Sequence, residues 1–193
     1  MRKSVAVAIL AGLFSIMVAV PAEAGWNPLK KDKTEEQKAE EQKAEDAEIA
    51  EAIAAFKAED PDMKVFFDEA YGYAVFPSVG KGAVGIGGAY GSGRVYEKGR
   101  EIGDTKLSQV TIGFQLGGQA YREIIFFQNK AALDDFTSGN FEFSAQASAV
   151  ALTSGVAKDA DYSDGVAIFT IEKGGLMYEA SIGGQKFSFD RNK

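Results

Sequence analysis

Residues 110–117 read Val-Thr-Ile-Gly-Phe-Gln-Leu-Gly, with a large apolar residue at every second position. A period of two over this length is typical of a half-buried β-strand. Residues 124–127, Ile-Ile-Phe-Phe, form a continuous apolar run that predicts a central strand covered on both faces. Further strands are expected at residues 141–149, 166–171, 176–182 and 186–189. Because glycine-bearing turns separate these segments, the sequence favours a mainly antiparallel sheet.

Helix-forming residues precede the strand region. Residues 35–59 are rich in Ala, Glu, Lys and Gln, and Thr34 and Gln37 have the spacing of a capping box. Only Ile49, Ile53 and Phe56 give this segment an apolar face. We therefore expect a solvated helix that docks against the rest of the protein near Ile49.

Two shorter helices are also expected. Asp60 and Pro61 suit the start of a helix that ends at Gly72. Asn129 is expected to cap a helix over residues 130–136.

The many glycines of the strand region predict a strongly bent sheet. Glycine in a strand costs stability, but it permits bulges, bending and close backbone approach. We therefore expect an α+β fold, in which a curved, mainly antiparallel, barrel-like β-sheet carries N-terminal helices and one short internal helix.

The first residues have the order of a secretory signal: Arg2 and Lys3, an apolar run, and Ala22-Glu23-Ala24. The sequence predicts a signal peptide at residues 1–24, a charged linker and helical spacer at residues 25–48, and a folded domain at residues 49–193. The expected location is exported, periplasmic or secreted after signal-peptide cleavage. A retained membrane anchor is the alternative, although the apolar run is shorter than the roughly 20 residues that a spanning helix needs.

Composition excludes several classes of function. The formal net charge is −7, so we expect no nucleic-acid partner, because nucleic-acid affinity depends on many Lys and Arg contacts to phosphates. The chain has no His and no Cys, which removes the common catalytic triads, thiol chemistry and the usual zinc and copper ligand sets. Residues 82–93 are glycine-rich but lack the spacing and the following helix of a nucleotide site. We expect no catalytic residue, no metal and no cofactor; a hydrolase that uses two carboxylates is kept as a third class.

Several segments resemble one family. Residues 70–82 read Ala-Tyr-Gly-Tyr-Ala-Val-Phe-Pro-Ser-Val-Gly-Lys-Gly, and residues 113–119, 143–148 and 174–178 follow in family order. Residues 60–193 thus resemble the SYLF (Ysc84-type) domain family. The resemblance implies a non-enzymatic phospholipid-binding module, with actin binding in some members. Because the segment before the domain is acidic here, we do not expect actin as a partner.

Most candidate lipid contacts lie in or near residues 70–82, the most family-like segment. Lys81 is the first candidate for a headgroup contact, since we expect it on a glycine-rich turn with accessible backbone amides. Arg94 and Lys98 would add positive charge nearby. Phe76 and Pro77 would line an edge that contacts acyl chains. Lys173, at a similar Lys-Gly turn, is a second candidate for a headgroup contact.

Two other interpretations remain open. Lys81 could be a solvated turn lysine and Phe76 a core residue. The alternative function is a structural or protein-interaction module of the periplasm or cell surface, without lipid binding and with an envelope protein as partner. Tyr90, Tyr96 and Tyr121 would then serve the interaction surface.

Overall fold

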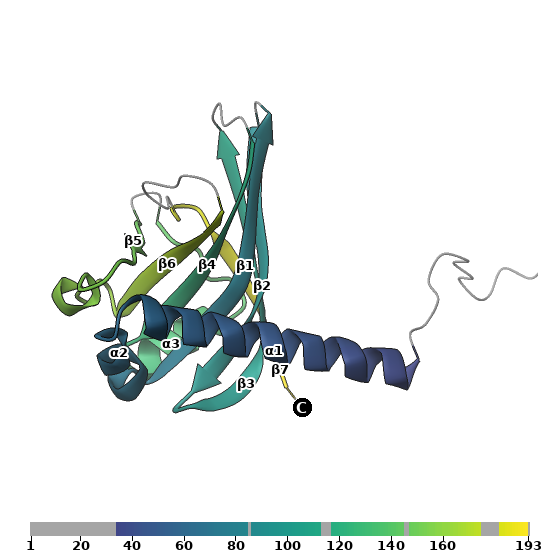
Figure 1. Cartoon of the computed structure of the whole chain (residues 1–193), viewed down its shortest axis with the longest axis horizontal. Helices are drawn as coiled ribbons and strands as arrows, with labels where there is room; N and C mark the ends of the chain where they lie inside the picture. Colours follow the sequence, from purple (N-terminus) through teal and green to yellow (C-terminus); the bar gives the residue numbers. More distant parts are fainter. Residues whose placement is uncertain (1–33, 85, 113–116, 145–146, 175–181, 193) are drawn as a thin grey trace, which may run out of the picture. The chain divides into compact units, whose positions relative to one another are not determined.

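A computed structural model describes residues 34–84, 86–112, 117–144, 147–174 and 182–192, which contain three α-helices and a seven-stranded sheet (Figure 1). The helices are α1 (Glu35–Glu59), α2 (Met63–Glu69) and α3 (Lys130–Phe136). The strands are β1 (Gly72–Val84), β2 (Ile86–Glu97), β3 (Arg100–Ile112), β4 (Gly117–Phe127), β5 (Val150–Ala151), β6 (Val166–Gly174) and β7 (Lys186–Arg191).

The strands follow the order β5-β6-β4-β1-β2-β3-β7. Every neighbouring pair is antiparallel except β5 and β6. The predicted α+β class and mainly antiparallel sheet are therefore confirmed. The sheet is curved but does not close, because β5 and β7 form its two ends.

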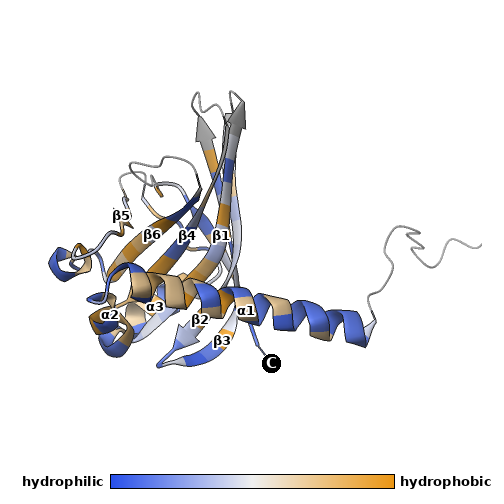
Figure 2. Cartoon of the chain, viewed as in Figure 1, coloured by the Kyte–Doolittle hydropathy of each residue, from blue (hydrophilic) through white to orange (hydrophobic). Residues whose placement is uncertain are grey.

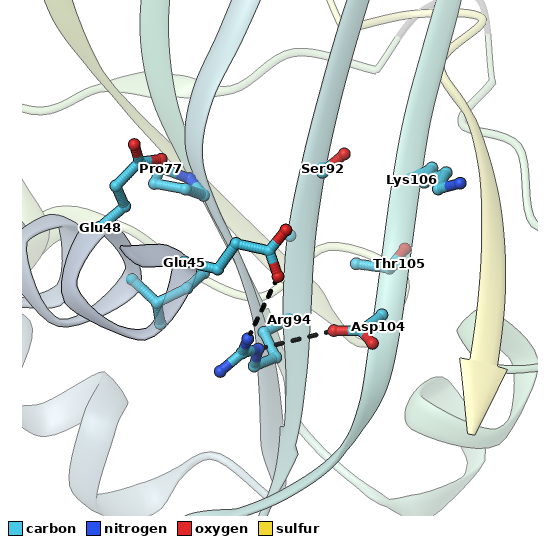
Figure 3. Close-up of a pocket in the computed structure, with 10 residues that line it drawn as sticks. Glu45, Glu48, Pro77, Ser92, Arg94, Asp104, Thr105 and Lys106 are labelled. Carbon is cyan, nitrogen blue, oxygen red and sulfur yellow. Dashed lines mark ion pairs between the residues drawn. The ribbon is translucent and has the colours of Figure 1, made fainter. Parts of the chain in front are cut away.

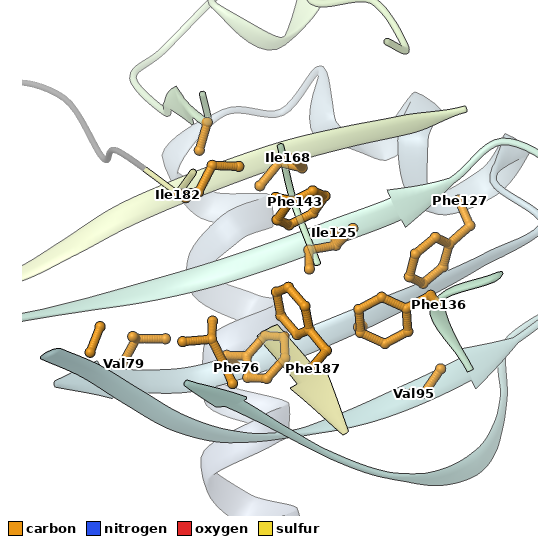
Figure 4. Close-up of a cluster of buried hydrophobic side chains, with 14 of the residues drawn as sticks. Phe76, Val79, Val95, Ile125, Phe127, Phe136, Phe143, Ile168, Ile182 and Phe187 are labelled. Atoms are coloured by element: carbon orange, nitrogen blue, oxygen red, sulfur yellow. The ribbon is translucent and has the colours of Figure 1, made fainter. Parts of the chain in front are cut away.

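The curvature brings the inner faces of distant strands together. Phe187 on β7 lies with its ring 5.7 Å from the ring of Phe76 on β1, although β2 and β3 separate these strands in the sheet. Phe136 of α3 and Phe143 pack on Phe187 from the open side, at 5.0 and 5.3 Å between ring centroids (Figure 4). This inner core is continuous from β6 to β7, so the inner face is largely filled by side chains.

The outer face of the sheet is covered by α1 and α2. The buried residues of α1 are Ile49, Ala52 and Phe56. They pack in one cluster with Met63 and Phe66 of α2. The half of α1 that precedes Ile49 is exposed and hydrophilic (Figure 2). The helix thus docks where its apolar face begins, as expected, and it runs without a break across the predicted boundary at residue 48.

Some strand and helix predictions are confirmed closely. The helix at residues 130–136 begins as predicted, since the side chain of Asn129 accepts a hydrogen bond from the amide of Ala132 at 3.1 Å. Residues 124–127 lie in β4, between β6 and β1, and are fully buried. Asp60 lies one turn before the second helix, which starts at Met63: its Oδ1 accepts from the amide of Asp62 at 3.0 Å, and its Oδ2 accepts from the amide of Ala157 at 2.8 Å.

The predicted strand at residues 141–149 is wrong within its described part. Glu142 makes one isolated bridge to Lys186, and the amide of Ala147 donates to the carbonyl oxygen of Ser144 at 3.0 Å. Small Ala and Ser side chains provide little apolar surface for cross-strand pairs, which weakens a strand. The strand predicted at residues 176–182 lies outside the described residues except for Ile182, which is buried.

The turn predicted at Lys81-Gly82 is also wrong. Both residues lie inside β1, which pairs with β2 and with β4 up to Ala83 and reaches Val84 opposite Ile86. The segment from Arg94 is likewise a strand up to Glu97, and only Lys98 and Gly99, both with positive φ, form the turn to β3. A Lys-Gly pair is often found in turns, but here hydrogen bonding to β2 and to β4 keeps both residues in an extended strand.

Candidate functional site

Lys81 projects from the inner face of the sheet. Val79, two residues earlier on a regular stretch of β1, belongs to the inner core, and Ala89, which pairs with Lys81 on β2, belongs to it as well. Since residues two apart and cross-strand partners share a face, the Lys81 side chain lies on that face too. It is 9% exposed.

The Lys81 ammonium is in an unusual setting for a cation. Among the described residues it has no ion pair, and burial alone lowers its pKa from the ordinary value of 10.5. Burying a charge without a partner is costly, and an anion that approaches it would reduce that cost. Its apolar neighbours on the same face would suit the hydrocarbon part of an amphiphile.

A polar cluster lies on the same inner face, closer to the core. Gln185 donates from Nε2 to Glu123 at 3.0 Å and to the hydroxyl of Tyr121 at 3.2 Å. Glu123 is fully buried, and burial raises its pKa to about 7, an effect that the Gln185 hydrogen bond partly offsets. Burial, more than the nearby Glu123 charge, also raises the pKa of Tyr121. The cluster contains one carboxyl group, so it does not supply the carboxylate pair of a hydrolase.

Arg94 occupies a different place, on the outer face beneath α1. Its side chain is 4% exposed, and the guanidinium pairs with four carboxylates: Asp46, Glu101 at 3.2 Å, Asp104 at 3.5 Å and Glu45 at 3.7 Å. Figure 3 shows the pairs with Asp104 and Glu45. A cavity of about 300 Å³ beside it is lined by Pro77, Ile49 and Lys106 among others. The four acidic partners already neutralise the charge of Arg94. Their ion pairs connect α1 with β2 and β3.

The other predicted contacts are spread over the fold. Phe76 is fully buried in the inner core. Lys98 lies on the β2–β3 turn, with its Nζ 4.8 Å from the centre of the Tyr71 ring. Lys173 is exposed near the end of β6. Of the six predicted residues, Arg94 and Pro77 lie together around one cavity, and the lipid-binding role of each of the six stays a prediction.

The tyrosines proposed for an interaction surface differ in exposure. Tyr121 is 1% exposed, and Tyr96 is half-buried and stacked on Tyr73 with ring centroids 4.8 Å apart. Tyr90, at 57% exposed, is the one of the three that lies on a surface.

The described part of the chain contains neither a metal-binding group of side chains nor a helix that could span a membrane. No group of three or more His, Cys, Asp or Glu residues there could hold a metal ion. In the same residues no helix is both long enough and apolar enough to cross a membrane.

Glu123 and Gln185 were not anticipated from the sequence. They are 62 residues apart and meet only because β4 and the segment before β7 converge on the inner face. The one local signal of a buried carboxyl group is the position of Glu123 directly before the apolar run at residues 124–127.

Comparison with known proteins supports the resemblance. Residues 108–193 match the model of the Ysc84 family, described as "Las17-binding protein actin regulator". The chain is 33% identical over 135 residues to "Beta cell expansion factor A" of Aeromonas veronii, an alignment that covers 69% of this chain and 51% of that protein. The chain thus spans about half the length of this relative. The family match contains the family-like segments at residues 113–119, 143–148 and 174–178, whereas residues 70–82 precede it, and the chain belongs to the Ysc84 (SYLF) family.

Proposed function

We propose that this domain binds phospholipid without transforming it, as a module of the cell envelope. The observation that carries the proposal is Lys81, an almost buried ammonium that has no ion pair among the described residues and whose neighbours Val79 and Ala89 on the inner face are apolar. A lipid headgroup phosphate is an anion of suitable charge, and the attached acyl chains would suit the apolar neighbours.

Family membership supports a binding module of the lipid or actin type. Between these ligands, the Lys81 environment favours an amphiphile over a folded protein partner. Actin would need a complementary protein surface, and the exposed half of α1 is acidic.

The exported location is a prediction from residues 1–24, which lie outside the described residues. For an exported bacterial-type protein, phosphatidylglycerol and phosphatidylethanolamine are the expected ligands. An anionic headgroup is preferred because the contact assigned to it is a cation.

Vesicle flotation tests the proposal. The purified protein, with its N-terminus read by mass spectrometry, is mixed with phosphatidylcholine vesicles that contain or lack phosphatidylglycerol. We expect flotation that increases with phosphatidylglycerol content. Failure to float with either vesicle would contradict lipid binding and favour the protein-interaction alternative.

A further inference from the structure

Acidic residues are absent from two long stretches of an acidic chain. Among 28 Asp and Glu residues, none falls in residues 70–96 or in residues 105–122. The structure places the middle of both stretches at one end of the sheet, where β1 meets β2 and where β3 ends and β4 begins. In Figure 1 these strand ends extend beyond β6 and away from the helices.

Three rows of paired residues lie beyond Lys81 at this end, and none is charged. They are Gly82, Gly88 and Val110, then Ala83, Gly87 and Thr111, then Val84, Ile86 and Ile112. At roughly 3.3 Å a row, they extend about 10 Å past the ammonium-bearing row. That length is similar to the depth of about 5–10 Å at which amphipathic segments lie in a membrane interface.

The outer face of the sheet carries exposed residues on both sides of the Lys81 row: in the row behind it, which contains Gly80 and Tyr90, and in the first row beyond it, which contains Gly82 and Val110. Tyr90 is 57% exposed and Val110 is 78% exposed, and they are two of the three large hydrophobic residues of the described chain that are exposed. Gly80 and Gly82, which share this face, have no atom within 4 Å of the position that a Cβ would take. The exposed side chains of Tyr90 and Val110 thus lie beside glycines whose backbone no side chain covers.

We propose that the ends of β1, β2 and β3 enter a lipid bilayer tip-first, with Lys81 at the depth of the phosphates. This inference rests on the proposed function and adds the surface that meets the membrane. We name the described part of this surface, Gly80, Gly82, Gly88, Tyr90 and Val110, the strand-end surface.

Charge distribution favours a bilayer as the occupant. The three rows beyond Lys81 carry no charged side chain, so moving them from water into a bilayer does not require a charge to lose its hydration. The nearest charged residues behind these rows on β1 and β3 are Lys81 and Lys106, both cations. Tyr90 adds an aromatic ring with a polar hydroxyl, which is typical of residues at the membrane interface.

The strand edges limit how deep the contact can go. β3 pairs with β7 only as far as Ser108, and β4 pairs with β6 only from Ala120 on, so both strands continue past their outer neighbours among the described residues. Backbone groups without partners are not tolerated in hydrocarbon. In the described residues, backbone groups that lack a strand partner are suited to the hydrated interface.

A unique cysteine provides a direct test, because the chain has no Cys of its own. Val110→Cys carries an environment-sensitive fluorophore, and Val65→Cys, at an exposed apolar position of α2 (53% exposed), is the matched control. Both are titrated with vesicles of phosphatidylcholine and phosphatidylglycerol. We expect a blue shift and stronger emission from the label at residue 110, and no change at residue 65.

The outcomes separate this inference from the proposed function. If the unchanged protein floats with vesicles but the label at residue 110 responds no more than the label at residue 65, the strand-end surface is overturned and lipid binding stands. If the residue 110 signal changes with protein concentration in the absence of lipid, a second copy covers this face, and the inference is again overturned.

A second variant checks the energetics. Val110→Asp is expected to weaken vesicle binding by about tenfold or more, since a carboxylate would have to leave water. Val65→Asp should leave binding unchanged. Equal binding by Val110→Asp and the unchanged protein would contradict entry of the strand ends.

Discussion

Gln185 and Glu123 form a hydrogen bond of 3.0 Å inside the curved sheet, and both side chains are fully buried. Gln185 lies just before β7 and Glu123 on β4, so the bond connects parts of the sheet that curvature brings together. The second carboxylate oxygen of Glu123 has no hydrogen-bond partner among the described residues. A protonated carboxyl group is favoured in such a place.

Stability should therefore depend on pH through Glu123. Burial raises its pKa from 4.5 to about 7, so the folded state keeps the proton longer than the unfolded state. The stabilisation by the protonated form is full below pH 4.5 and is lost as pH rises toward about 7. We expect the free energy of unfolding to fall by about 3 kcal/mol across this window relative to Glu123→Gln.

Urea denaturation at several pH values measures this difference. Subtracting the Glu123→Gln curve removes the contribution of all other titrating groups. Parallel stability profiles for the two proteins between pH 4.5 and pH 8 would show that Glu123 titrates normally.

Arg94 should be more important for stability than any one of its carboxylate partners. Arg94→Gln leaves four carboxylates near one another, and we expect a loss of about 2 kcal/mol in unfolding free energy. Asp46→Asn should cost less than about 1 kcal/mol, because the Asp46 side chain is 53% exposed and three other carboxylates remain. Chemical denaturation of both variants and of the double variant measures the coupling. Equal losses of unfolding free energy in Arg94→Gln and Asp46→Asn would contradict the claim that four carboxylates share Arg94 as their cationic partner.

Two glycines of the sheet should respond oppositely to alanine. A Cβ at Gly103 would overlap the carbonyl oxygen of Asp190, so Gly103→Ala should destabilise the protein by about 1–3 kcal/mol. Gly82 has no atom within 4 Å of the position that a Cβ would take. Gly82→Ala should therefore stabilise the protein by about 0.4–1 kcal/mol, because alanine lowers the conformational entropy of the unfolded chain. Thermal unfolding would refute this contrast if both variants shifted the midpoint in the same direction.

Local chemistry accounts for what the sequence predicted well. The helix after Asn129 depends on a cap three residues away, and the strand at residues 124–127 on a continuous apolar run. The period of two predicted a single strand at residues 110–117, and this is wrong: residues 110–112 end β3 and Gly117 begins β4, while residues 113–116 lie outside the described part of the chain.

Long-range pairing explains what the sequence could not predict. Lys81-Gly82 has the residues of a turn, yet β2 and β4 hold both residues in an extended strand. Arg94 was expected near Lys81, but successive strand residues point to opposite faces, and α1 carboxylates, contributed from 48 residues away, cover the guanidinium. The absence of acidic residues from 70–96 and 105–122 was visible in the sequence, but only the sheet order shows that these stretches meet.

The most direct test of the central claim compares how Lys81→Gln and Lys64→Gln bind vesicles with and without phosphatidylglycerol. Both changes remove one positive charge, and Lys64 lies exposed on α2. We predict that Lys81→Gln loses about fivefold in affinity for the anionic vesicles, the effect of one lysine near a charged membrane surface, while Lys64→Gln binds like the unchanged protein. Unaltered headgroup preference in Lys81→Gln would contradict recognition of the lipid through this ammonium.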